Sequence, residues 1–87
     1  MKKKETFILR TILGKHVMMP VEATALKFNG LITANETAAF IWEHIEQVET
    51  AEEMAKLLCS EFEVDPEQAR NDCTAVIAQM KQAGWIE

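Results

Sequence analysis

Two histidines and two cysteines are among the side chains of this 87-residue chain that suit acid–base, nucleophilic or metal chemistry. No motif places a serine or cysteine beside His16 or His44, so we interpret both as surface or structural residues. Cys59 and Cys73 stand far apart, and neither has a second cysteine or a histidine at metal-ligand spacing. The spacing therefore indicates neither a zinc site nor a disulfide framework, and we expect two buried thiols.

An acidic cluster of Glu49, Glu52 and Glu53 could supply oxygen ligands to a metal ion. The cluster coincides with the first turn of a predicted helix, where carboxylates interact favourably with the helix dipole, and this second interpretation is the stronger one. The sequence contains no glycine-rich phosphate loop, no HExxH helix and no nucleophile elbow. We therefore predict that the chain is not an enzyme and that it holds no metal or other cofactor.

Length and composition predict one small domain that spans residues 1–87. The chain is 48% apolar, and a domain of this size needs most of its apolar residues for its core, which leaves little room for a deep cavity. The basic start MKKKETF is not followed by the apolar run of a signal peptide, and no segment is long enough to span a membrane. We expect a cytoplasmic protein.

Charge is distributed unevenly along the chain. Residues 1–27 contain six Lys or Arg and two Glu, a net charge of +4, and the remainder contains three Lys or Arg and twelve Asp or Glu, a net charge of −9, consistent with the formal net charge of −5. The acidic remainder repels phosphate groups over most of its surface. We therefore predict neither a nucleic-acid partner nor a membrane partner.

The first part of the chain has the residues of a small antiparallel sheet. TFILRTIL and KHVMMP are rich in β-branched and large apolar residues and are separated by a glycine, which predicts a hairpin of strands 6–13 and 15–20. The connection 21–30 lacks clean periodicity and ends in Asn29-Gly30, a turn signal. LIT then predicts a short third strand over 31–33.

Helices are expected after this sheet. The first has two possible starts, because Thr33 and Glu36 can form a capping box and Asn35 is itself a good N-cap, and apolar residues then recur at helical spacing as far as residue 45. Thr50 and Glu53 form a second capping box, which opens the second helix.

The third predicted helix is the longest and runs from Pro66 to Ala83. Asp65 is its N-cap, a proline at the first helical position loses no needed N–H, and Gly84 fits the left-handed position past its end. We expect Trp85 and Ile86 to fold back as an apolar clip. The element order predicts an α+β fold, a winged helix-turn-helix in which a small three-stranded antiparallel sheet is followed by three helices.

Two surfaces of such a fold could bind a macromolecule. In the first, the second and third helices act as a helix-turn-helix and DPEQARN enters the DNA major groove, but Asp65 and Glu67 would face phosphates and Arg70 alone is a nearby cation. In the second, the open edge of strand 31–33 presents unpaired N–H and C=O groups to an extended peptide. An ordinary edge strand, kept short as protection against aggregation, is the alternative interpretation.

The sequence resembles the PqqD-like family over nearly its whole length. The residues that carry the resemblance are HVMMP, FNGLITANETAAFIWEHI and TAEEMAKLLCSEFEVDPEQARNDCTAVIAQMKQAGWIE, which are specific in combination. Family members are recognition elements for ribosomally made, post-translationally modified peptides. The resemblance implies a peptide chaperone that captures the leader segment of a precursor peptide and presents it to a modifying enzyme, typically a radical S-adenosylmethionine (radical SAM/SPASM-type) maturase.

The resemblance also implies a site, in which the leader adds to the edge of the third strand and lies between it and the third helix. The strand residues of this site are Gly30, Leu31, Ile32, Thr33 and Ala34. The third helix has two flanks. We favour Arg70, Thr74, Ile77 and Lys81, because two cations around an apolar residue suit an acidic and aliphatic leader, over Asp72, Val76, Gln79 and Ala83. The alternatives that Arg70 and Lys81 are solvated and that Ile77 belongs to the core stay open, as does the oligomeric state.

Overall fold

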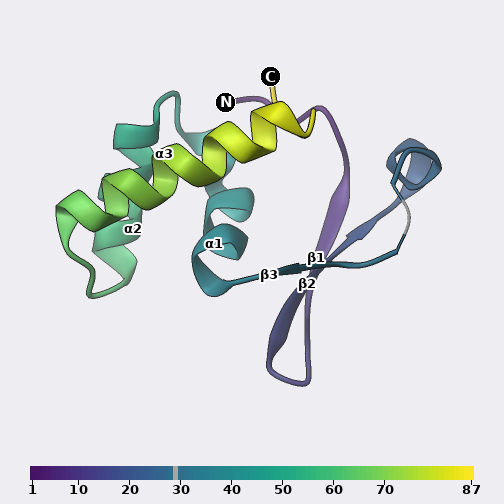
Figure 1. Cartoon of the computed structure of the whole chain (residues 1–87), viewed down its shortest axis with the longest axis horizontal. Coiled ribbons are helices and arrows are strands. Elements are labelled where there is room, and N and C mark those ends of the chain that lie inside the picture. The colour runs from purple at the N-terminus through teal and green to yellow at the C-terminus, as the bar shows by residue number, and fades with distance from the viewer. Residues whose placement is uncertain (29) are drawn as a thin grey trace.

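A computed structural model describes residues 1–28 and 30–87 and shows a three-stranded sheet followed by three α-helices (Figure 1). Strands β1 (Phe7–Ile12), β2 (Lys15–Pro20) and β3 (Ile32–Ala34) are antiparallel and lie in the order β1-β2-β3. The α+β architecture expected from the sequence is confirmed. Among the described residues, no helix is both long and apolar enough to cross a membrane.

The hairpin of β1 and β2 is closed by the two residues Leu13 and Gly14. Their φ angles are 51° and 78°, so both have the positive φ of a type I′ turn, whose twist matches that of the strands. The pair next to the turn is Ile12 with Lys15, and the register continues to Phe7 with Pro20. The predicted hairpin is therefore confirmed, with β1 one residue shorter at each end than the sequence suggested.

The connection after β2 is more regular than expected, because it contains a 3-10 helix over Glu22–Leu26. The buried carboxylate of Glu5 accepts hydrogen bonds from the Thr24 hydroxyl at 3.2 Å and from the Lys27 ammonium at 3.0 Å. These bonds attach the connection to the segment before β1. Of the predicted Asn29-Gly30 turn, Asn29 lies outside the described residues.

Strand β3 is shifted by one residue from the predicted 31–33. Gly30 has a φ of +76°, and the chain enters the ladder only at Ile32, which pairs with Met18. At the other end Ala34 pairs with His16 and remains in the strand. The prediction of a very short third strand was right, and its boundaries were wrong because the left-handed glycine delays pairing.

Helix α1 (Glu36–His44) begins at the second of its two possible caps. The side chain of Asn35 accepts a hydrogen bond from the Ala38 N–H at 2.8 Å, so Asn35 and not Thr33 is the N-cap. The helix ends one residue before the expected end, and a 3-10 turn over Ile45–Gln47 follows.

Helices α2 (Ala51–Glu61) and α3 (Pro66–Gln82) begin as predicted. Both hydrogen bonds of the capping box that opens α2 are present, because the side chains of Thr50 and Glu53 each accept from the other residue's backbone N–H. The Asp65 side chain accepts from the Gln68 N–H at 3.2 Å, with proline following at the first helical position. Gly84 has a φ of +81° just beyond the end of α3, which is the left-handed conformation that the sequence indicated.

The core lies between the helices and one face of the sheet. Phe7 of β1 and Met18 of β2 belong to it. The largest side chains that are fully buried are Trp42, Met18, Ile41, Ile45, Met54, Leu58 and Cys73. Cys59 is only partly buried, so the expectation of two buried thiols was right for Cys73 alone.

The two ends of the chain pair with each other. Lys3 and Ile86 form an antiparallel bridge, the Lys4 N–H donates to the Trp85 carbonyl at 2.8 Å, and both termini lie side by side (Figure 1). Ile86 is buried and Trp85 packs on Phe7 with ring centroids 4.8 Å apart. The C-terminal residues thus form the predicted clip, and they pair with the N-terminal segment and not with β3.

Candidate functional site

The sheet has two edge strands, β1 and β3, and the side of β3 that faces away from β2 is the candidate peptide-binding edge. β3 pairs with β2 on one side, and on its other side no strand follows within residues 1–28 and 30–87. A free edge carries backbone N–H and C=O groups that another extended chain can bind. The edge consists of Ile32–Ala34 and lies immediately before α1.

The geometry of the hairpin identifies the backbone groups that face outward. In a hairpin with a two-residue turn, the pair next to the turn, here Ile12 and Lys15, is a hydrogen-bonded pair. Because bonding groups alternate along a strand, the next residue of β2 and every second one after it bond to β3, which engages Ile32 and Ala34. The N–H and C=O of Thr33, the central residue of β3, therefore point to the free side.

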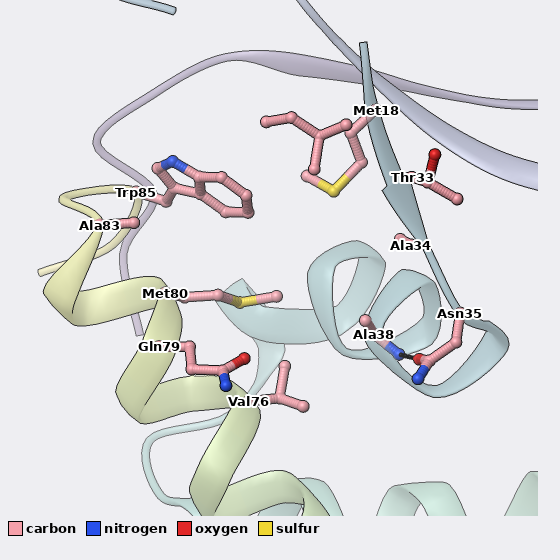
Figure 2. Close-up of a pocket in the computed structure, with 11 residues that line it drawn as sticks. Met18, Thr33, Ala34, Asn35, Ala38, Val76, Gln79, Met80, Ala83 and Trp85 are labelled. Atoms are coloured by element: carbon pink, nitrogen blue, oxygen red, sulfur yellow. Dashed lines mark hydrogen bonds between the residues drawn. The ribbon is translucent and has the colours of Figure 1, made fainter.

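A groove of about 380 Å³ lies beside this edge. Its walls come from β3, the start of α1, and the last turns of α3 (Figure 2). Figure 2 shows Val76, Gln79 and Met80 reaching from α3 towards the side formed by Ala34 and Ala38. The residues that line the groove are Met18, Ile32, Thr33, Ala34, Asn35, Ala38, Val76, Gln79, Met80, Ala83 and Trp85.

The groove is uncharged. Its polar side chains are Thr33, Asn35 and Gln79, and all the others that line it are apolar. Met18 and Met80 are buried core residues that form the floor of the groove. Trp85 closes one end with its six-membered ring towards the groove and its nitrogen directed away (Figure 2). An uncharged, largely apolar groove is suited to aliphatic or aromatic side chains and not to carboxylates.

The favoured flank of α3 does not line this groove. Ile77 is only 5% exposed and belongs to the core, and Thr74 and Lys81 are exposed without reaching the groove. Arg70 lines a separate pocket with Lys56 and other residues of α2. The flank that was set aside contributes three of the lining residues, Val76, Gln79 and Ala83.

Of the five strand residues in the predicted site, some line the groove and others do not. Ile32, Thr33 and Ala34 line the groove, whereas Gly30 and Leu31 precede the strand and do not line it. The sequence interpretation missed Asn35, Ala38 and the clip residue Trp85, among others. The signal for Trp85 was present, because an apolar residue just after the glycine that ends α3 must turn back towards the sheet.

The side chains considered for chemistry are held in structural contacts. His44 stacks on the ring of Phe40, and its Nδ1 lies 2.9 Å from the Phe40 carbonyl, to which it donates. The Nδ1 atom of His16 lies 3.4 Å from the hydroxyl of Thr11. Burial raises the pKa of the Cys73 thiol to about 11, and the nearby Asp72 carboxylate adds to this effect, so the thiol is neutral at physiological pH.

The fold and the site define a small α+β protein in which the free edge of a three-stranded sheet borders an uncharged groove. The family model described as Coenzyme PQQ synthesis protein D (PqqD) matches residues 15–86. The chain belongs to the PqqD family, as its sequence motifs indicated. Among curated proteins, none matches this sequence.

Two solved structures share the fold. The first, "TbiB1 in Complex with the TbiA(beta) Leader Peptide", has a TM-score of 0.67 and 17% identity, with 100% of this chain and 95% of that chain covered. The second, "Lasso peptide synthetase B1 complexed with the leader peptide", has a TM-score of 0.65 and 21% identity over the same shares. Both alignments cover this entire chain, so the similarity in fold is not confined to the sheet or to the helices.

Proposed function

We propose that this protein is a peptide chaperone that captures the leader segment of a ribosomally synthesised precursor peptide by β-strand addition to β3. Membership of the PqqD family supports leader recognition, and two proteins of the same fold have been solved in complex with leader peptides. The observation that carries the proposal is the free edge centred on Thr33, with the groove directly beside it.

The proposed mechanism separates affinity from selectivity. The leader pairs in extended form with the outward N–H and C=O of Thr33, and these main-chain bonds do not depend on the identity of the leader residues. Alternate side chains of the leader then point into the groove, since successive residues of a strand face opposite sides. Val76, Gln79 and Ala83 are the groove residues of α3 that are exposed or partly exposed, and they are available to contact these side chains.

The lining of the groove changes the expected leader chemistry. The sequence suggested an acidic and aliphatic leader on the strength of Arg70 and Lys81, but neither cation lines the groove. We infer that the bound segment presents aliphatic or aromatic side chains and that the amide of Gln79 supplies polar contact. A carboxylate in this position would lose its hydration without gaining a cationic partner.

The captured peptide is presented to a modifying enzyme, and the chaperone itself does no chemistry. Family resemblance supports a radical SAM/SPASM-type maturase as that enzyme, and the iron–sulfur cluster belongs to the maturase and not to this chain. Capture and presentation of the peptide take place in the cytoplasm. The whole chain, residues 1–87, acts as a single domain in both steps. In this proposal the fold is a winged helix-turn-helix scaffold that binds peptide in place of nucleic acid.

A titration followed by amide NMR tests the proposal. The probe is a synthetic leader peptide of a candidate precursor. We expect shifts at Gly30–Ala34 and at Val76, Gln79 and Ala83, with Arg70 and Lys81 unchanged. Shifts confined to Pro66–Asn71 on addition of duplex DNA, with none on addition of leader, would instead assign a nucleic-acid-binding winged helix.

A further inference from the structure

The face of the sheet that points away from the core is apolar and exposed. Ile8 and Ile12 of β1 and Met19 of β2 are 38%, 46% and 36% exposed. They share one face, because Ile8 pairs with Met19 and Ile12 lies four residues further along β1. The opposite face carries Phe7 and Met18, which are buried in the core. Large apolar residues gathered on one exposed face indicate an interaction surface.

The hairpin turn continues this surface. Leu13 is 98% exposed and has a φ of 51°, a left-handed conformation that disfavours leucine and favours glycine or asparagine. Because the Leu13 side chain is exposed, its burial does not stabilise the fold, and its left-handed backbone conformation lowers the stability of the fold. Strain of this kind persists where the side chain serves a function. Figure 1 shows the turn projecting away from the helices, where a partner can reach it.

The charges on this face all have one sign. Arg10 and Lys15 point to the same side as Ile8, Ile12 and Met19, and none of the three strands contains Asp or Glu. The rest of the molecule differs, since residues 28–87 contain three Lys or Arg and twelve Asp or Glu. The outer face thus combines exposed apolar side chains with two cations, Arg10 between Ile8 and Ile12 and Lys15 opposite Ile12, on an otherwise acidic protein.

We propose that this outer face, formed by Ile8, Arg10, Ile12, Leu13, Lys15 and Met19, docks a second protein whose own contact surface is apolar with acidic residues around it. A second copy of the chain fits poorly, because a symmetric contact would bring the cations of both faces together. Anionic lipid and nucleic acid also fit poorly, because the acidic helices would be repelled.

The proposed docking face and the peptide groove do not overlap. None of the six residues of the docking face lines the groove, so a leader and a partner protein can be bound together. We identify the partner as the modifying enzyme, and this identification rests on the proposed function. Docking would then hold the enzyme on one side of the sheet while the leader occupies its edge.

Leu13→Asn separates docking from stability. Asn-Gly is the preferred sequence of a type I′ turn, so this variant should melt at a higher temperature than wild type. The probe is a purified candidate radical SAM maturase, titrated by calorimetry. We expect its affinity to fall by at least about tenfold, since a buried leucine is lost, while the leader affinity is unchanged. Leu26→Asn is the matched control, because Leu26 is 90% exposed in the 3-10 helix, well apart from the turn (Figure 1), and should change neither affinity.

A charge-reversal pair tests the electrostatic part. Arg10→Glu with Lys15→Glu should weaken enzyme binding more at low salt than at high salt, and Lys56→Glu with Lys81→Glu should not.

Two results would overturn the proposal and leave leader capture intact. In the first, the wild-type protein binds the leader but not the enzyme. In the second, Leu13→Asn and wild type bind the enzyme with equal affinity. A dimer in light scattering, or binding to phosphatidylglycerol vesicles or duplex DNA, overturns it if Leu13→Asn abolishes that association.

Discussion

Replacing Thr33 with proline should remove one hydrogen-bond donor from the free edge without breaking the sheet. The N–H of Thr33 points away from β2, so no bond of the β2–β3 ladder is lost, and the preceding Ile32 is already in the extended conformation that a following proline requires. A leader carbonyl that loses its donor in the complex costs about 1–3 kcal/mol. We therefore expect the leader dissociation constant to rise by about 5- to 150-fold.

Isothermal titration calorimetry with the leader peptide measures this change, and circular dichroism establishes that the variant is folded. Thr33→Val is the matched control, since it keeps the backbone N–H and the shape of the side chain and should bind the leader like wild type. Ile32→Pro provides a contrast, because the Ile32 N–H faces β2 and its loss should lower the stability of the fold. A folded Thr33→Pro variant with wild-type leader affinity would refute strand addition at this edge.

Two further predictions concern the groove and the buried thiol. Val76→Asp places a carboxylate in the uncharged groove and should weaken leader binding by about tenfold or more, whereas Thr74→Asp, exposed on the same helix outside the groove, should not, as calorimetry can show. Because burial raises the pKa of Cys73 from 9.0 to about 11, the unfolded state loses a proton between these pH values that the folded state keeps. Stability should therefore be fully retained below pH 9.0 and fall by about 2 kcal/mol as pH rises to 11, and urea unfolding of Cys73→Ala should lack this component.

Local signals in the sequence were enough to predict the strands and α-helices of the fold, but not the 3-10 helix over Glu22–Leu26. Caps such as Asp65, the glycine after α3 and the apolar spacing within each helix depend on neighbours within a few residues, and the structure confirms them. Boundaries were less well predicted where two local signals competed. Asn35 replaced Thr33 as the cap of α1 because Thr33 is held in β3 by its pairing position opposite Val17.

The groove could not be predicted in the same way, because it depends on how α3 is rotated against the sheet. Every helix offers two flanks beside its buried stripe, and residue spacing does not distinguish them. The cations of Arg70 and Lys81 favoured one flank on chemical grounds, yet the packing of Met80 in the core turns the other flank towards β3. Val76, apolar and next to the core residue Ile77, was the available signal for the flank that lines the groove.

The sequence alone also does not show which backbone groups of β3 face outward, because this depends on the register of the strands. Only the two-residue turn at Leu13 and Gly14, together with the pairing of β2 and β3, identifies Thr33 as the residue whose backbone faces outward. A shift of one residue in β3 would have exchanged the inward and outward groups. The exposed apolar face of β1 and β2 likewise emerges only once the register assigns each side chain to a face.

An isotope-filtered NOE experiment on the labelled protein with unlabelled leader peptide tests strand addition most directly. We predict cross-peaks between backbone protons of the leader and those of Thr33, together with leader side-chain contacts to Val76 and Gln79. Cross-peaks from a bound leader to other surfaces of the protein, with none to Ile32–Ala34, would contradict it.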